Sequence, residues 1–143
     1  MNKYFDERQL KIRGEVFFHG LIAALALLLI NALLNALDIV WASGFHQNIV
    51  MLGIVVMVVI IEAILRDVFF GMGQLTWPII GAYVVGAAVF IYSFVTSFML
   101  GNTLVYDGML TNHGLMGLVM IMYAFIAVAG LVKVIIEKLI NHE

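Results

Sequence analysis

The sequence has no cysteine, a single proline and few charged residues. The absence of cysteine excludes disulfides, thiolate metal sites and thiol chemistry. Charged residues make up 11% of the chain, whereas soluble domains have about 25%. Apolar residues make up 64%, whereas soluble domains have about 45–50%. The net charge of −2 provides no basic surface of the kind that binds nucleic acid. Composition therefore predicts an integral membrane protein with no nucleic-acid partner.

The motifs of common enzyme classes are missing as well. The sequence contains no phosphate-binding Gly-rich loop with Lys, no Gly-x-Ser-x-Gly and no His-Glu-x-x-His. We expect His19 near one membrane edge and His46 and His113 near the other, which argues against haem ligation across the helices. We therefore expect a non-catalytic protein that needs no cofactor.

Four long apolar runs fill most of the chain, and the first one shows their length. From Val16 to Leu37 the only strongly polar side chains are His19, Asn31 and Asn35. These 22 residues reach about 33 Å as a helix, which matches a hydrocarbon core of about 30 Å. We predict an all-α, polytopic protein with one membrane domain over residues 1–143, built as a four-transmembrane-helix bundle. The predicted spans are about 16–38, 49–66, 77–100 and 115–134.

The basic residues predict the orientation of the spans. All seven lysines and arginines lie before the first span, at the end of the second or at the end of the fourth, and the other two loops have none. Because Lys and Arg are in excess on the cytoplasmic side, we expect N-in/C-in topology. We therefore predict that the chain lies in the lipid bilayer of the cell (cytoplasmic) membrane, with both termini in the cytoplasm.

Residues 1–15 form a charged segment that we predict to be an amphipathic helix at the cytoplasmic interface. Glu7 and Lys11 form a favourable pair at i, i+4 spacing. Two interpretations stay open, a solvated flank or a docking surface for a soluble or membrane protein partner. The docking surface would consist of Asp6, Glu7, Arg8 and Gln9.

One acidic residue and one histidine accompany each loop at the outer end of the spans. These residues are Asp38 and His46 in the first loop, and Asp107 and His113 in the third. Two imidazoles and two carboxylates form a donor set suited to tetrahedral zinc. Their spacing matches no ligand motif, so solvated loop residues are the other interpretation.

A second polar group lies at the inner end of the first two spans. It consists of Glu15, His19, Glu62 and Arg66. Ionisable side chains at the membrane margin suggest a function by default, since proton relays use carboxylates and imidazoles. The alternative is that they reach the headgroup region or pair between helices.

Polar side chains also form a stripe on the first span and another on the third. The stripes contain Asn31, Asn35 and Asp38, and Ser93, Thr96 and Ser97. Small and polar residues favour close helix packing in lipid, so we expect the two stripes to face each other. They would either line a shallow cavity for a small polar ligand or peptide, or serve only as interhelical hydrogen bonds.

The start Asp6-Glu7-Arg8-Gln9, followed by a basic stretch and four short spans, resembles small bacterial membrane proteins of unknown function with a DERQ-like motif. Some such families are encoded beside helix-turn-helix regulators, and the resemblance therefore implies a membrane-bound regulatory or accessory role. Small multidrug transporters also have four spans, but they carry a Glu within the first span, whereas Glu15 lies at the edge here.

Two functions from different classes follow as hypotheses. The first is a regulatory, accessory or immunity-type protein that acts through helix contacts and its cytoplasmic amino-terminal segment. The alternative is a small proton- or cation-coupled transporter or channel that works as a homodimer and uses Glu62, His19 or Asp38. Regulation requires the amino-terminal segment, whereas transport should continue when residues of this segment are substituted.

Overall fold

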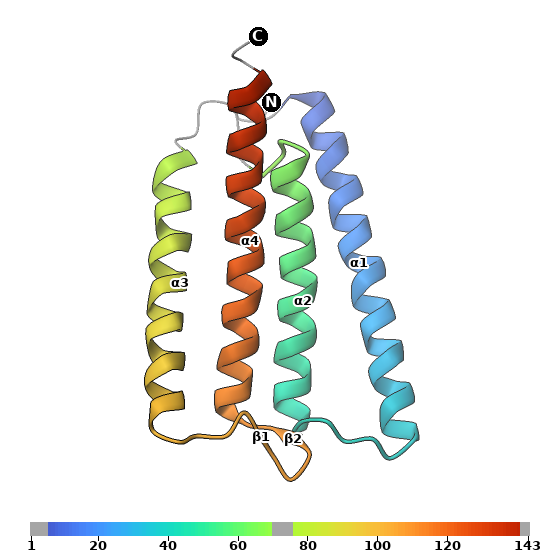
Figure 1. Cartoon of the computed structure of the whole chain (residues 1–143). Coiled ribbons are helices and arrows are strands. Elements are labelled where there is room, and N and C mark those ends of the chain that lie inside the picture. Colours follow the sequence, from blue (N-terminus) through green and yellow to red (C-terminus); the bar gives the residue numbers. More distant parts are fainter. Residues whose placement is uncertain (1–5, 70–75, 141–143) are drawn as a thin grey trace.

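The computed structural model describes residues 6–69 and 76–140 of the chain, and these are mostly helical (Figure 1). The elements are α1 (Glu7–Ala36), α2 (Gly44–Leu65), α3 (Thr76–Met99), β1 (Val105–Tyr106), β2 (Met109–Leu110) and α4 (Asn112–Ile140). Three helices, α1, α2 and α4, are long and apolar enough to cross a membrane, and α3 contains the shorter apolar segment Val84–Met99. The start of the predicted interfacial segment and residues 70–75 of the second loop lie outside the described residues.

The helices stand in a row in the order α1, α2, α4, α3 (Figure 1). The middle helices α2 and α4 pack on each other, α1 packs on the other side of α2, and α3 packs on the other side of α4. A closed bundle of four mutually packed helices is therefore not confirmed. The expected contact between the polar stripes of α1 and α3 is wrong, because these helices lie at opposite ends of the row.

Helix α1 begins with a capping box and continues without interruption through Gly14. The Asp6 side chain accepts a hydrogen bond from the Gln9 backbone N–H at 2.6 Å, and the Gln9 side chain accepts one from the Asp6 backbone N–H at 3.4 Å. Such reciprocal bonds satisfy amide groups that have no partner in the first helical turn. The charged residues from Glu7 to Glu15 are thus part of the same helix as the first apolar run.

Each helix contact in the row is made at a glycine. At the α1–α2 contact, a Cβ atom added to Gly20 would clash with Val59 Cγ2, so the backbone of α1 approaches α2 as closely as only glycine allows. The corresponding contacts are Gly53 with Met122 between α2 and α4, and Gly117 with Phe94 between α4 and α3.

A small β-hairpin lies in the loop between α3 and α4, and it was not among the predicted elements. Strands β1 and β2 are antiparallel, and the turn residues Asp107 and Gly108 have φ values of 50° and 74°. An Asp-Gly pair with positive φ at both positions is typical of a two-residue hairpin turn. The Leu110 backbone N–H donates to the Trp41 carbonyl at 2.9 Å, so the hairpin is fastened to the loop between α1 and α2.

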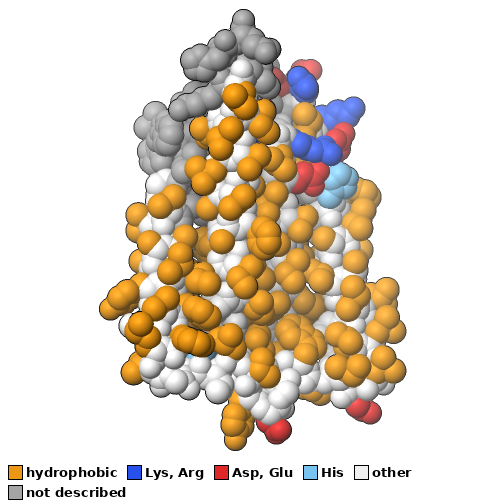
Figure 2. Space-filling model, in the orientation of Figure 1, with side chains coloured by type: hydrophobic (Ala, Val, Ile, Leu, Met, Phe, Trp, Pro, Cys, Tyr) orange, Lys and Arg blue, Asp and Glu red, His pale blue; other side chains and the backbone are white. Residues whose placement is uncertain are grey.

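The surface of the molecule separates apolar from charged side chains along the helix axes. Figure 2 shows hydrophobic side chains over most of the visible face, with basic, acidic and histidine side chains gathered at the end where α1 begins. Further acidic side chains appear at the opposite end. This distribution is the one expected for a protein whose apolar middle is covered by lipid.

Candidate functional site

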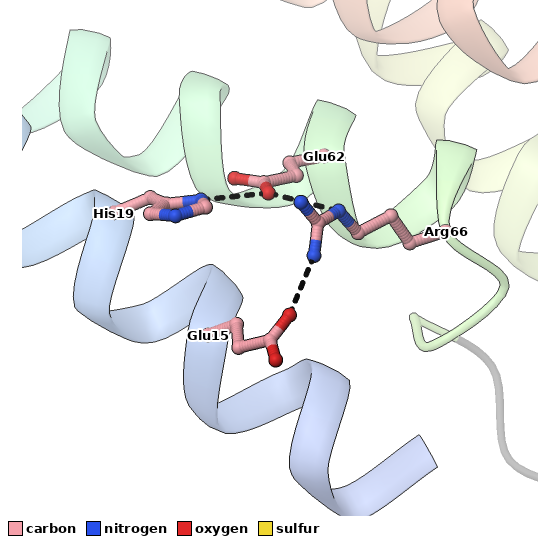
Figure 3. Close-up of polar contacts among 4 residues, drawn as sticks. All are labelled: Glu15, His19, Glu62 and Arg66. Carbon is pink, nitrogen blue, oxygen red and sulfur yellow. Dashed lines mark hydrogen bonds and ion pairs between the residues drawn. The ribbon is translucent and has the colours of Figure 1, made fainter. Parts of the chain in front are cut away.

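The inner cluster, which we define as Glu15, His19, Glu62 and Arg66, lies where the amino-terminal half of α1 meets the carboxyl-terminal end of α2 (Figure 3). The close approach at Gly20 brings the neighbouring His19 towards α2. On α2, Glu62 follows Val59 by about one turn and therefore lies near the same contact. The packing of two apolar helices thus sets the register of the four polar side chains.

Glu62 is the centre of the inner cluster. Its Oε1 atom lies 2.8 Å from His19 Nδ1 and 3.0 Å from Arg66 Nε. Arg66 also reaches α1, where its Nη1 atom donates to Glu15 Oε2 at 3.0 Å (Figure 3). The Glu62 side chain is 21% exposed, whereas the other three are between 39% and 48% exposed. The two carboxylates are therefore bridged by one guanidinium, and the imidazole binds the more enclosed carboxylate.

The charges of the inner cluster nearly cancel. Two carboxylates and one guanidinium leave a net charge of −1 when His19 is neutral, and a protonated His19 brings the sum to zero. Ion pairs with this exposure contribute about 0–1 kcal/mol each, so the cluster orients the helix ends more than it stabilises them. Chemically, an imidazole hydrogen-bonded to a carboxylate is able to hold or pass on a proton.

Further polar contacts extend the inner cluster towards α4. The Lys133 Nζ atom lies 2.6 Å from Asp67 Oδ2, and Gln9 Nε2 donates to the Asp67 carbonyl at 3.1 Å. The end of α2 is thereby linked to both α1 and α4. Lys133 and Asp67 were not among the predicted site residues, although opposite charges near the ends of two predicted spans were a signal for this pair.

The predicted docking residues divide into two kinds. Asp6 and Gln9 form the capping box, and Gln9 also holds the end of α2, so their side chains have structural roles. Glu7 and Arg8 are exposed. The prediction of a docking surface therefore depends on Glu7, Arg8 and their exposed neighbours on α1.

The predicted zinc site is not assembled. The His46 Nε2 atom lies 2.7 Å from Asn112 Oδ1, and His113 Nδ1 shares a hydrogen bond with the Ser97 hydroxyl. Asp38 and Asp107 are exposed turn residues with φ values of 57° and 50°. Among the described residues no group of three or more His, Asp or Glu side chains is placed to hold a metal ion. Of the two interpretations, zinc ligands or separate loop residues, this arrangement agrees with the second, because each imidazole has a neutral partner and the two carboxylates lie in separate turns.

The polar stripe on α1 finds its partners within the first helix pair. Asn31 Nδ2 donates to Gln47 Oε1 at 3.2 Å, and Trp41 Nε1 donates to Asn31 Oδ1 at 3.0 Å. Gln47 is only 5% exposed and donates through Nε2 to the Ala42 carbonyl at 2.9 Å. Asn35 and Asp38 of the same stripe remain exposed.

The stripe on α3 likewise finds its partners nearby. Ser97 accepts a hydrogen bond from Asn102 Nδ2 at 3.1 Å while its hydroxyl bonds His113. The Thr96 hydroxyl donates to carbonyls of its own helix, at Tyr92 and Ser93. Ser93 itself is half-buried. The stripes therefore make hydrogen bonds inside two separate helix pairs, and they do not line a cavity between α1 and α3.

Comparisons of the chain with protein-family models, with curated proteins and with solved structures find no match. The function is therefore inferred from the residues and the geometry of the chain itself.

Proposed function

We propose that this is a non-catalytic, multi-pass protein of the cell membrane with a regulatory, accessory or immunity-type role, which acts through helix contacts and contacts with a partner at its cytoplasmic face. The observation that carries the proposal is the 3.1 Å hydrogen bond from Gln9 Nε2 to the Asp67 carbonyl. With the capping box, it makes the charged first turns of α1 an ordered extension of the membrane helix. A bare solvated flank would need neither contact.

The exposed residues of these turns form what we call the α1 surface. The α1 surface consists of Glu7, Arg8, Leu10 and Lys11. Leu10 is an apolar side chain, 45% exposed, among charged ones, and the helix beneath is fixed at both Asp6 and Gln9. A preordered helix loses little conformational entropy when a partner binds, which favours a role in recognition.

The proposed topology places both termini and the α1 surface in the cytoplasm. The absence of Lys and Arg from the loops at the opposite end supports this orientation. Helix α3 is then the third of four spans, so that α4 returns the chain to the cytoplasmic side.

The test is a pull-down from native membranes in mild detergent. We compare wild type with Glu7→Ala/Arg8→Ala, which changes the α1 surface and keeps the capping box. Tyr106→Ala, an exposed side chain at the opposite end, is the control. We expect a partner that is lost with the double variant and retained with the control. Recovery of the chain alone, unchanged by the double variant, would contradict the proposal.

The contact between His19 and Glu62 favours a second candidate, a small proton- or cation-coupled transporter that works as a homodimer. Their 2.8 Å pair lies at the edge of the apolar surface, and an open row of helices leaves faces on which a second copy could pack. In proteoliposomes, this candidate predicts proton flux driven by a pH gradient that is abolished by Glu62→Gln and kept by Asp107→Asn. If wild type shows no flux, the transporter interpretation fails.

A further inference from the structure

The inner cluster lies at the depth of lipid headgroups. The 17 residues from Gly20 to Ala36 reach about 26 Å as a helix, close to the hydrocarbon thickness of about 30 Å. His19, which precedes Gly20, therefore lies at the margin of the apolar layer, and Glu15 lies about one turn beyond it. In the membrane location proposed above, the neighbours of these side chains are phospholipid headgroups of the inner leaflet.

The exposed side of the inner cluster has unused acceptors and donors. The hydrogen bonds of Glu15 and Glu62 each use a single carboxylate oxygen. Arg66 uses Nε and one Nη1 bond, so further N–H groups of its five donors remain. Lys11, exposed and one turn before Glu15 on α1, adds a cation next to the carboxylate. Acidic and basic groups thus alternate along one surface.

The balance of charge at this end distinguishes between kinds of headgroup. Among the described side chains at this end, five are acidic and five are basic: Asp6, Glu7, Glu15, Glu62 and Asp67, and Arg8, Lys11, Arg13, Arg66 and Lys133. Equal numbers of acidic and basic residues give no net positive surface of the type that recruits anionic lipids. A zwitterionic headgroup, with a cation and an anion side by side, matches this balance better.

We propose that the inner cluster binds the headgroup of an ethanolamine phospholipid. The primary ammonium donates hydrogen bonds to the free oxygens of Glu15 and Glu62, and the phosphate accepts hydrogen bonds from the free N–H groups of Arg66. A choline headgroup has the same charges but no N–H donors, so it satisfies only the electrostatic part of the site. The inference rests on the proposed membrane location but not on the proposed protein partner.

The experiment uses the full chain in vesicles that contain an ethanolamine phospholipid, its mono- and dimethyl derivatives, the choline phospholipid or phosphatidylglycerol, all with the same acyl chains. Flotation first measures membrane insertion, and native mass spectrometry then counts the lipids retained. We expect retention to fall with each methylation, by about two- to fivefold from the ethanolamine to the choline lipid, the range of exposed ion pairs.

Matched variants identify the groups responsible. Glu15→Gln/Glu62→Gln should lower retention of the ethanolamine lipid to the level of the choline lipid, whereas Asp107→Asn, a carboxylate at the other end, should leave retention unchanged. Circular dichroism checks the helix content, and the methylation series on wild type tests the site even if the double variant is unstable.

Three outcomes overturn the inference, and they are distinguishable. Equal retention of the ethanolamine and choline lipids in a chain that floats with the vesicles excludes the ammonium contacts. Greater retention of phosphatidylglycerol shows that Arg66 binds phosphate without Glu15 and Glu62. A chain that does not float with the vesicles contradicts the membrane location itself, and with it the proposed function.

Discussion

At the scale of the residue, the two asparagines of α1 differ sharply in their surroundings. Asn31 is half-buried and bonds both Gln47 and Trp41. Asn35 is exposed, and in the described part of the chain its side chain makes no hydrogen bond. We expect Asn31→Leu to lower the free energy of unfolding by about 1–2 kcal/mol, because two hydrogen bonds are lost and Gln47 keeps an unpaired acceptor in a buried place.

The measurement for this prediction is thermal or denaturant unfolding in detergent, monitored by tryptophan fluorescence. Asn35→Leu is the matched control, since it makes the same chemical change one turn along the helix, and we expect a change within about 0.5 kcal/mol. Equal losses of stability in the two variants would show that the bonds of Asn31 do not hold the end of α1 and the start of α2 together.

At the scale of the element, the contact between α1 and α2 depends on Gly20. A Cβ atom at this position would clash with a methyl group of Val59, and the β-branched valine has little rotamer freedom in a helix. We expect Gly20→Ala to destabilise the protein by about 1–2 kcal/mol, since overpacking exceeds the gain in helix propensity. Unfolding in detergent measures the effect.

The same helix provides the control for this prediction. Gly14 has nothing within 4 Å of its added Cβ, so Gly14→Ala should be neutral or stabilising by up to about 1 kcal/mol. Gly53→Ala meets the flexible Met122 side chain and should cost less than Gly20→Ala. A Gly20→Ala variant as stable as Gly14→Ala would show that α1 and α2 are not in close contact there.

The apolar runs of the sequence predicted the helices, but the β-hairpin was not predicted. Apolar runs longer than a soluble helix needs indicate the helices, and three of them have the length and composition to cross a membrane. The hairpin was missed, although Asp107-Gly108 between Val105-Tyr106 and Met109-Leu110 is a strong hairpin signal. The elements were predicted from the length of the apolar runs, and a two-residue turn does not show in that length.

At the scale of the whole molecule, the helix order was not predictable from polar patterning. Asn31 on α1 and Ser97 on α3 both suggested a polar contact, but each bonds a residue of its own helix pair, Gln47 and His113. The inner cluster was proposed as a group from the depth of its members, and the structure brings them together. Depth along the membrane can be estimated from sequence, whereas the choice of neighbour depends on packing at residues such as Gly20.

Topology is the property of the whole molecule that the absence of cysteine makes easy to test. Single cysteines at Glu7, Ser43 and Tyr106, all exposed, report on the two ends of the row without background labelling. The bond from Leu110 to Trp41 holds the hairpin and the first loop at one end. We therefore expect a membrane-impermeable maleimide to label Ser43→Cys and Tyr106→Cys in intact cells, and Glu7→Cys only after lysis.

Labelling of Glu7→Cys in intact cells would show the opposite orientation, in which the α1 surface does not face the cytoplasm. Labelling of Ser43→Cys without Tyr106→Cys would mean that α3 does not cross the membrane as proposed.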